Sequence, residues 1–249
     1  MRFGLSTAPQ NTTWDDVLAL WRAADDIDVF ESAWTFDHFY PIFSDSTGPC
    51  LEGWTTLAAL AQATTRLRAG VMVTGMVYRH PAVLANMAVT LDILSQGRLE
   101  LGIGAAWNEE ECDAYGIELG TLTERFDRFA EGLEVMHGLL TQETTTFHGR
   151  YYSVTDARCE PKSVQEPHPP IVIGGTGERR TIPLVARWAD HWNAGRTRGG
   201  RGYASDSAGA RSIPQRVQRV GQRGRQGRLA LRGRPSARPR LRSPRRTGF

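Results

Sequence analysis

The chain has 249 residues, enough for one large domain with a sizeable hydrophobic core. Its formal net charge of +3 averages two unlike parts: residues 194–249 hold sixteen arginines and one acid, giving +15, whereas residues 1–193 carry −12. The cysteines Cys50, Cys112 and Cys159 are far apart and odd in number, which argues against a disulfide framework or zinc site and favours a cytoplasmic location. No stretch resembles a signal peptide or a membrane span, so no membrane partner is expected.

Short apolar strands alternate with longer helical patterns along residues 1–193. In chain order, the pattern predicts strands at 2–6, 31–39, 67–73, 98–104 and 171–173. Helices are predicted to begin at Thr13 and to span 52–63, 80–94, 121–140 and 178–189. Such a run of βα units implies a parallel sheet. The pattern alone leaves two architectures open, a (β/α)8 barrel and an open doubly wound sheet.

Ligands bind at the C-terminal ends of the strands in both architectures, so the residues that follow each strand are the candidate site. After the fifth strand come Gly174, Gly175, Thr176 and Gly177, the glycine corner. Glycines remove Cβ atoms and allow positive φ, so that successive N–H groups can converge on one anion at a helix start. The glycine corner therefore indicates phosphate binding; a tight turn without a ligand is the alternative.

The second and third strands end in residues that could bind a cofactor or take part in a reaction. His38 at the end of the second strand could hydrogen-bond a cofactor or move a proton; the alternative is a surface histidine held by its neighbour Asp37. Gly75 follows the third strand and would let a flat ligand approach the backbone closely, unless it only begins a plain loop.

The fourth strand ends in small residues followed by an aromatic residue and acids. Gly104 leaves room at the strand end, Trp107 could line a cleft for a ring, and Glu109 could serve as an acid or base. The alternative is that the three glutamates at 109–111 favour the start of a helix through its dipole.

Together these stretches resemble the bacterial luciferase-like flavin and deazaflavin oxidoreductases, a superfamily of (β/α)8 barrels, and most closely its branch that uses coenzyme F420. The resemblance covers residues 1–193. It is carried by TFDHF (35–39), EGWTTLAALAQATTRLRAG (52–70), VTGMVYRHPAVLANMAVTLDILSQGRLELGIGAAWNEEE (73–111), YG (115–116), ERF (124–126), FHGRYYSV (147–154) and PHPPIVIGGTGERRT (167–181).

The resemblance implies an α/β fold of the (β/α)8 TIM-barrel type and an F420-dependent oxidoreductase that acts on a small organic substrate. It is also compatible with a homodimer. FMN is the alternative cofactor, and would make the protein a luciferase-like monooxygenase. His38 would lie near the reactive face of the cofactor, and Glu109 would be the acid after the fourth strand. Thr74, Gly75 and Met76 would form the bulge behind the ring, often with a non-prolyl cis peptide. The glycine corner would hold the cofactor phosphate. The branch has a histidine where this chain has Cys112.

The alternation of strands and helices ends after residue 193. Residues 1–193 therefore provide about five to six βα units of the barrel domain. Residues 194–249 form a tail rich in arginine and glycine that is expected to be disordered or translated out of frame. The barrel is therefore expected to be incomplete at its C-terminus. An alternative is an arm that binds nucleic acid non-specifically through its arginines. In that case the chain is an inactive, truncated product with a basic tail.

Overall fold

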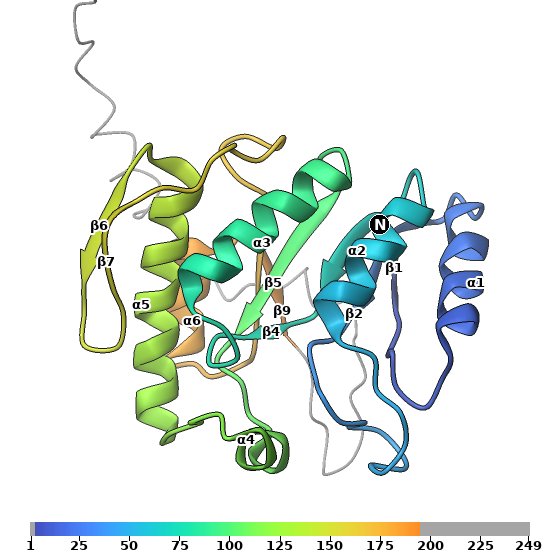
Figure 1. The fold of residues 1–249 in the computed structure, drawn as a ribbon, viewed down its shortest axis with the longest axis horizontal. Coiled ribbons are helices and arrows are strands. Elements are labelled where there is room, and N and C mark those ends of the chain that lie inside the picture. Colours follow the sequence, from blue (N-terminus) through green and yellow to red (C-terminus); the bar gives the residue numbers. More distant parts are fainter. Residues whose placement is uncertain (1–2, 195–249) are drawn as a thin grey trace, which may run out of the picture.

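The main sheet is entirely parallel and has the strand order β1-β2-β3-β5-β8-β9, with β4 paired to the far end of β5 (Figure 1). The computed structural model describes residues 3–194; residues 195–249 of the predicted tail lie outside them. The strands are β1 (Phe3–Ser6), β2 (Phe30–Thr35), β3 (Arg68–Val71), β4 (Thr74–Gly75), β5 (Leu99–Gly104), β8 (Ile171–Gly174) and β9 (His191–Asn193).

The strand order separates the two architectures that the sequence pattern left open. A doubly wound sheet reverses its order at a switch point, where ligands bind. Here the order rises along the chain without reversal, so each βα unit is added on the same side of the preceding one. The sheet is thus a half-barrel, which confirms the predicted barrel-type α/β fold.

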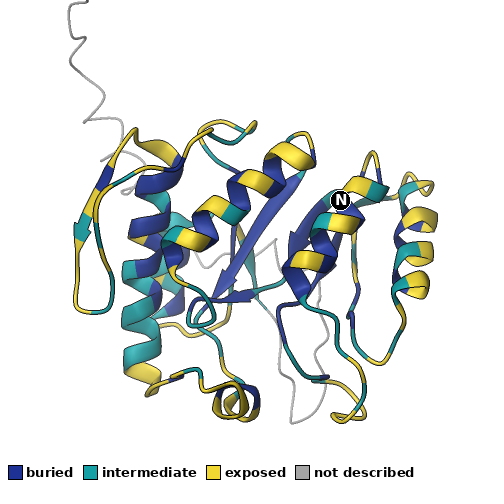
Figure 2. Ribbon diagram, viewed as in Figure 1, coloured by how far each residue is buried: buried dark blue, intermediate teal, exposed yellow. Residues whose placement is uncertain are grey.

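Helices pack against the outer face of this sheet, where the hydrophobic core lies. Figure 1 shows α2 (Gly53–Ala63), α3 (Pro81–Leu94) and α5 (Leu122–Thr141) side by side in front of the strands, with α1 (Trp14–Asp25) beside them. Their buried stripes face the sheet (Figure 2). The remaining elements are α4 (Glu109–Tyr115), α6 (Thr181–Trp188) and the hairpin of β6 (Thr145–His148) and β7 (Ser153–Ala157).

Local chemistry explains where several helices begin. The hydroxyl of Thr13 accepts from the N–H of Asp16 at the start of α1. Thr121 and Glu124 form a full capping box at the start of α5. Both caps satisfy N–H groups that the first helical turn leaves unpaired. They lie at the helix starts that the sequence predicts, Thr13 and Thr121.

Three predicted boundaries are wrong, and each error has a local cause. The second strand ends at Thr35 instead of residue 39, because Asp37 and His38 turn inward to partners on other loops. The predicted strand 67–73 ends at Val71 as β3, before the cis peptide bond Met72-Val73, and β4 follows at Thr74–Gly75. The last helix begins at Thr181 after a turn at 178–180.

Strand β9 and the β6–β7 hairpin are absent from the prediction, whereas α4 begins at Glu109, as the alternative interpretation of the three glutamates expected. No helix within residues 3–194 is long and apolar enough to cross a membrane.

Candidate functional site

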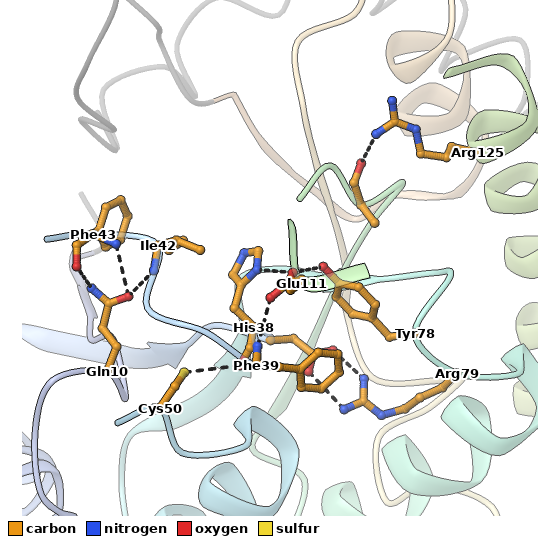
Figure 3. Close-up of polar contacts among 12 residues, drawn as sticks. Gln10, His38, Phe39, Ile42, Phe43, Cys50, Tyr78, Arg79, Glu111 and Arg125 are labelled. Carbon is orange, nitrogen blue, oxygen red and sulfur yellow. Dashed lines mark hydrogen bonds and ion pairs between the residues drawn. The ribbon is translucent and has the colours of Figure 1, made fainter. Parts of the chain in front are cut away.

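A buried carboxylate lies at the C-terminal end of the sheet, where the loops after β2 and β4 meet α4 (Figure 3). The Glu111 side chain is fully buried. One of its oxygens accepts from Nδ1 of His38 at 2.7 Å and also from the hydroxyl of Tyr78. The other accepts from the backbone N–H of Phe39 at 3.0 Å. One carboxylate on α4 thus joins two loops, and the three segments are more than thirty residues apart in sequence.

These contacts fix the protonation of the cluster. Burial by itself would raise the pKa of Glu111, but the hydrogen bonds from His38 and Tyr78 outweigh it and hold that pKa below its usual range. Burial and the nearby carboxylate both raise the pKa of Tyr78, so its hydroxyl stays protonated and donates. A charged carboxylate accepts only, so Nδ1 of His38 must carry a proton. Nε2 is then the ring nitrogen left for a ligand.

The lowered pKa of Glu111 makes stability depend on pH in a definite direction. A carboxyl whose pKa falls on folding stabilises the protein above its unfolded pKa of about 4.3, and this contribution is lost as the pH falls through the folded value. We expect wild type to exceed Glu111→Gln in unfolding free energy by roughly 2 kcal/mol at pH 7, and this difference to shrink below about pH 4. Urea unfolding of both proteins from pH 7 to pH 3 measures it. A difference that stays constant over this range would contradict the assignment.

A second ionic network lies beneath His38. The Arg79 guanidinium donates to both oxygens of Asp37, at 2.5 and 3.0 Å, and to Glu52 at 2.7 Å. Asp37 is completely buried. Burial opposes the charge of Arg79, but Asp37 and Glu52 outweigh it and raise the Arg79 pKa. Glu52 also caps α2 by accepting from the N–H groups of Trp54 and Thr55. The network therefore ties the loop that carries His38 to the loop that carries Tyr78.

The edge of the sheet is shaped by a bulge between β3 and β4. Val73 stands over the ends of β5 and β8, which are glycines. A Cβ at Gly104 would lie 2.8 Å from a methyl of Val73, and one at Gly174 would lie 3.1 Å from both methyls. The side chain of Val73 is half-buried. It therefore forms an apolar floor that remains partly accessible at this edge.

The glycine corner follows β8 on the same edge and is exposed at residues 175–177. Gly175 has a φ of +123°, which favours glycine. Its N–H donates to the carbonyl of Asn193 and its carbonyl accepts from the indole of Trp192, so β9 holds it on both sides. The N–H groups of Thr176 and Gly177 have no acceptor within residues 3–194. These two amides lie five and four residues before the start of α6, and successive unpaired N–H groups of this kind are suited to an anion.

The other predicted residues have different surroundings. Thr74 accepts from the indole of Trp54 at 2.8 Å. The side chain of Met76 belongs to the core and packs against Gly132 of α5. The cis bond precedes these residues instead of lying at Gly75 and Met76.

At the end of β5, Gly104 accepts from the N–H of Met76. Trp107 is 48% exposed and its ring meets that of His38 edge-on at 5.5 Å. Glu109 is exposed in the first turn of α4, whereas the acid that contacts His38 is Glu111, two residues later. Sequence reasoning did not single out Glu111.

The sequence matches a known protein family and several characterised relatives. The sequence model of the luciferase-like monooxygenases matches residues 1–231. An F420-dependent glucose-6-phosphate dehydrogenase from Intrasporangium calvum is 35% identical over 187 residues, which are 74% of this chain and 52% of that protein. An F420-dependent hydroxymycolic acid dehydrogenase from Mycobacterium tuberculosis is 31% identical over 166 residues, or 66% and 45% of the two chains.

The fold is also shared with solved structures. An F420-dependent secondary alcohol dehydrogenase in complex with an F420-acetone adduct superposes with a TM-score of 0.74 at 22% identity, covering 89% of this chain and 64% of that one. The chain spans about half the length of the curated relatives it matches. The match of the family model to most of the sequence, together with the parallel half-barrel, shows that the chain belongs to the luciferase-like monooxygenase family.

Proposed function

We propose that this protein is an F420-dependent oxidoreductase that transfers a hydride between the deazaflavin cofactor and a small organic substrate. The observation that carries the proposal is the placement of two features on one edge of the sheet. These are His38, oriented by the buried Glu111, and the glycine corner with two unpaired amides. The names of the relatives support F420 as the cofactor.

The residues at this edge fit such a cofactor. The N–H groups of Thr176 and Gly177 would bind its phosphate, and the Thr176 hydroxyl would add a donor. Val73, raised over Gly104 and Gly174, would support one face of the ring system. When bound, the deazaflavin supplies a carbon-5 centre that accepts or donates a hydride.

His38 would accept or donate the proton that is transferred in the same reaction. When an alcohol is oxidised, its hydroxyl proton would pass to Nε2 of His38, and in the reverse direction His38 would return it to the carbonyl oxygen. Glu111 would stabilise the imidazolium that forms, because its carboxylate lies 2.7 Å from Nδ1. We therefore assign the supporting acid to Glu111 in place of Glu109. His38 is a catalytic residue in this scheme and Glu111 is a positioning residue.

Fluorescence titration of the full chain with F420 and with FMN tests the proposal. We expect saturable binding of F420 that is at least ten-fold tighter than that of FMN. Tighter binding of FMN would instead support a luciferase-like monooxygenase, and no binding of either would reject the cofactor site.

The variant Gly177→Val tests the glycine corner. A Cβ there would lie 3.1 Å from the Thr181 hydroxyl, so the fold can accommodate the change, but a valine side chain would cover the free amides. We expect F420 to bind at least ten-fold more weakly. The isosteric Thr176→Val is the matched control, with a smaller loss, because it keeps both amides. Equal affinities for Gly177→Val and wild type would reject the anion site.

A further inference from the structure

We propose that the substrate which meets His38 is a neutral aromatic or aliphatic alcohol or carbonyl compound, and that phosphorylated and carboxylated substrates bind more weakly. This inference rests on the proposed function and adds the chemical class of the substrate. It separates this protein from the relatives named as glucose-6-phosphate dehydrogenases.

Aromatic side chains surround His38 and continue outward from it; we name Phe36, Phe39, Trp107 and Tyr115 the aromatic wall. Phe36 and Trp107 meet the His38 ring edge-on, with centroids 5.2 and 5.5 Å away. Phe39 stacks on Tyr115 at 4.7 Å. The backbone N–H of Phe39 is bound to Glu111, which fixes the wall to the catalytic cluster (Figure 3).

The outer part of the aromatic wall is open to solvent. Trp107 is 48% exposed and Tyr115 is 54% exposed, although both are large aromatic side chains beside a candidate catalytic group. Aromatic rings offer a large apolar area with little loss of side-chain entropy on binding. A neutral ring or alkyl chain placed next to His38 would cover this area and gain its burial.

The charges around the wall act against an anion. Neither residues 36–51 nor residues 105–121 contain a lysine or arginine. Arg79 is bound to Asp37 and Glu52. Arg125 has no acidic partner within the described residues and its buried Nε is unpaired, but its guanidinium donates to the carbonyl of Ala106 (Figure 3).

Exposed acids add to this effect. Glu109, Glu110 and Asp113 are all exposed on α4, beside the wall. Within the described residues, a phosphate next to His38 would thus lose water and face three exposed acids against one arginine, Arg125. Loss of water and repulsion between like charges both cost free energy. A neutral substrate avoids both costs.

The test compares the binding of 1-phenylethanol with that of glucose 6-phosphate to the full chain, with and without saturating F420, by saturation-transfer NMR. We expect 1-phenylethanol to bind at least ten-fold more tightly. We expect Trp107→Ala to weaken its binding at least five-fold, while Leu122→Ala, which removes an even more exposed apolar side chain at the start of α5, leaves it unchanged. The double variant Glu110→Lys/Asp113→Lys should bind glucose 6-phosphate more tightly than wild type does.

Equal or tighter binding of glucose 6-phosphate to wild type, no binding of 1-phenylethanol, or equal effects of Trp107→Ala and Leu122→Ala would overturn the inference. The F420 titration is scored separately, because the wall does not include the glycine corner. Failure of F420 binding with preserved preference for 1-phenylethanol would reject the proposed function alone. Normal F420 binding with preference for glucose 6-phosphate would reject the substrate class alone.

Discussion

Replacing Arg79 with methionine is expected to lower the free energy of unfolding by about 3–5 kcal/mol, because it leaves the fully buried carboxylate of Asp37 without its cation. Methionine keeps most of the side-chain volume, so the loss reports the missing charge rather than a cavity. Chemical denaturation of the variant and of wild type measures it. The same change should weaken any ligand contact of His38, since the network connects its loop to that of Tyr78.

Two further variants make this result specific. Arg180→Met removes a half-exposed arginine that pairs with Asp127 at 3.1 Å, and is expected to cost about 1 kcal/mol or less, because solvent screens such pairs. Asp37→Asn/Arg79→Met should recover part of the loss, since no uncompensated charge remains. If the double variant is as unstable as Arg79→Met, the penalty does not come from the buried charge.

Gly102→Ala is expected to destabilise the sheet by at least about 3 kcal/mol. A Cβ at this position would lie 1.9 Å from the carbonyl oxygen of Val71 and 3.0 Å from its carbon. Backbone atoms of a neighbouring strand cannot move aside as a side chain can, so β3 and β5 would have to separate. Thermal unfolding followed by circular dichroism measures the effect.

Gly104→Ala is the matched comparison on the same strand. There the new methyl would meet only a methyl of Val73, at 2.8 Å, which can shift. We expect a smaller loss of stability than for Gly102→Ala. We also expect weaker cofactor binding, because the side chain of Val73 would be displaced toward the cofactor site. Equal destabilisation by the two alanines would contradict the difference between a backbone and a side-chain obstacle.

The sequence predicts the fold where local signals are strong. The N-cap threonines Thr13 and Thr121 and the apolar run of β5 place their elements to within one or two residues. Strand β9 carries no such signal, because His191–Asn193 is three residues long and becomes a strand only by pairing with β8. The break at Met72-Val73 is likewise invisible in a continuous apolar run.

The candidate site shows the same limit. His38 and the glycine corner could be predicted, since strand ends are where ligands bind in parallel sheets. Glu111 could not, because its burial depends on a partner 73 residues away, and its neighbours at 109 and 110 are chemically identical but exposed. Which of three successive glutamates turns inward is decided by the orientation of α4.

The two hydrogen bonds between β9 and Gly175 have a consequence for ligand affinity. Because β9 binds both the N–H and the carbonyl of that residue, the corner keeps its shape only while the strand is docked. Docking of the strand and occupation of the corner are then linked equilibria, and each must favour the other by the same factor. An anion at residues 176 and 177 would slow hydrogen exchange in a strand that it never touches.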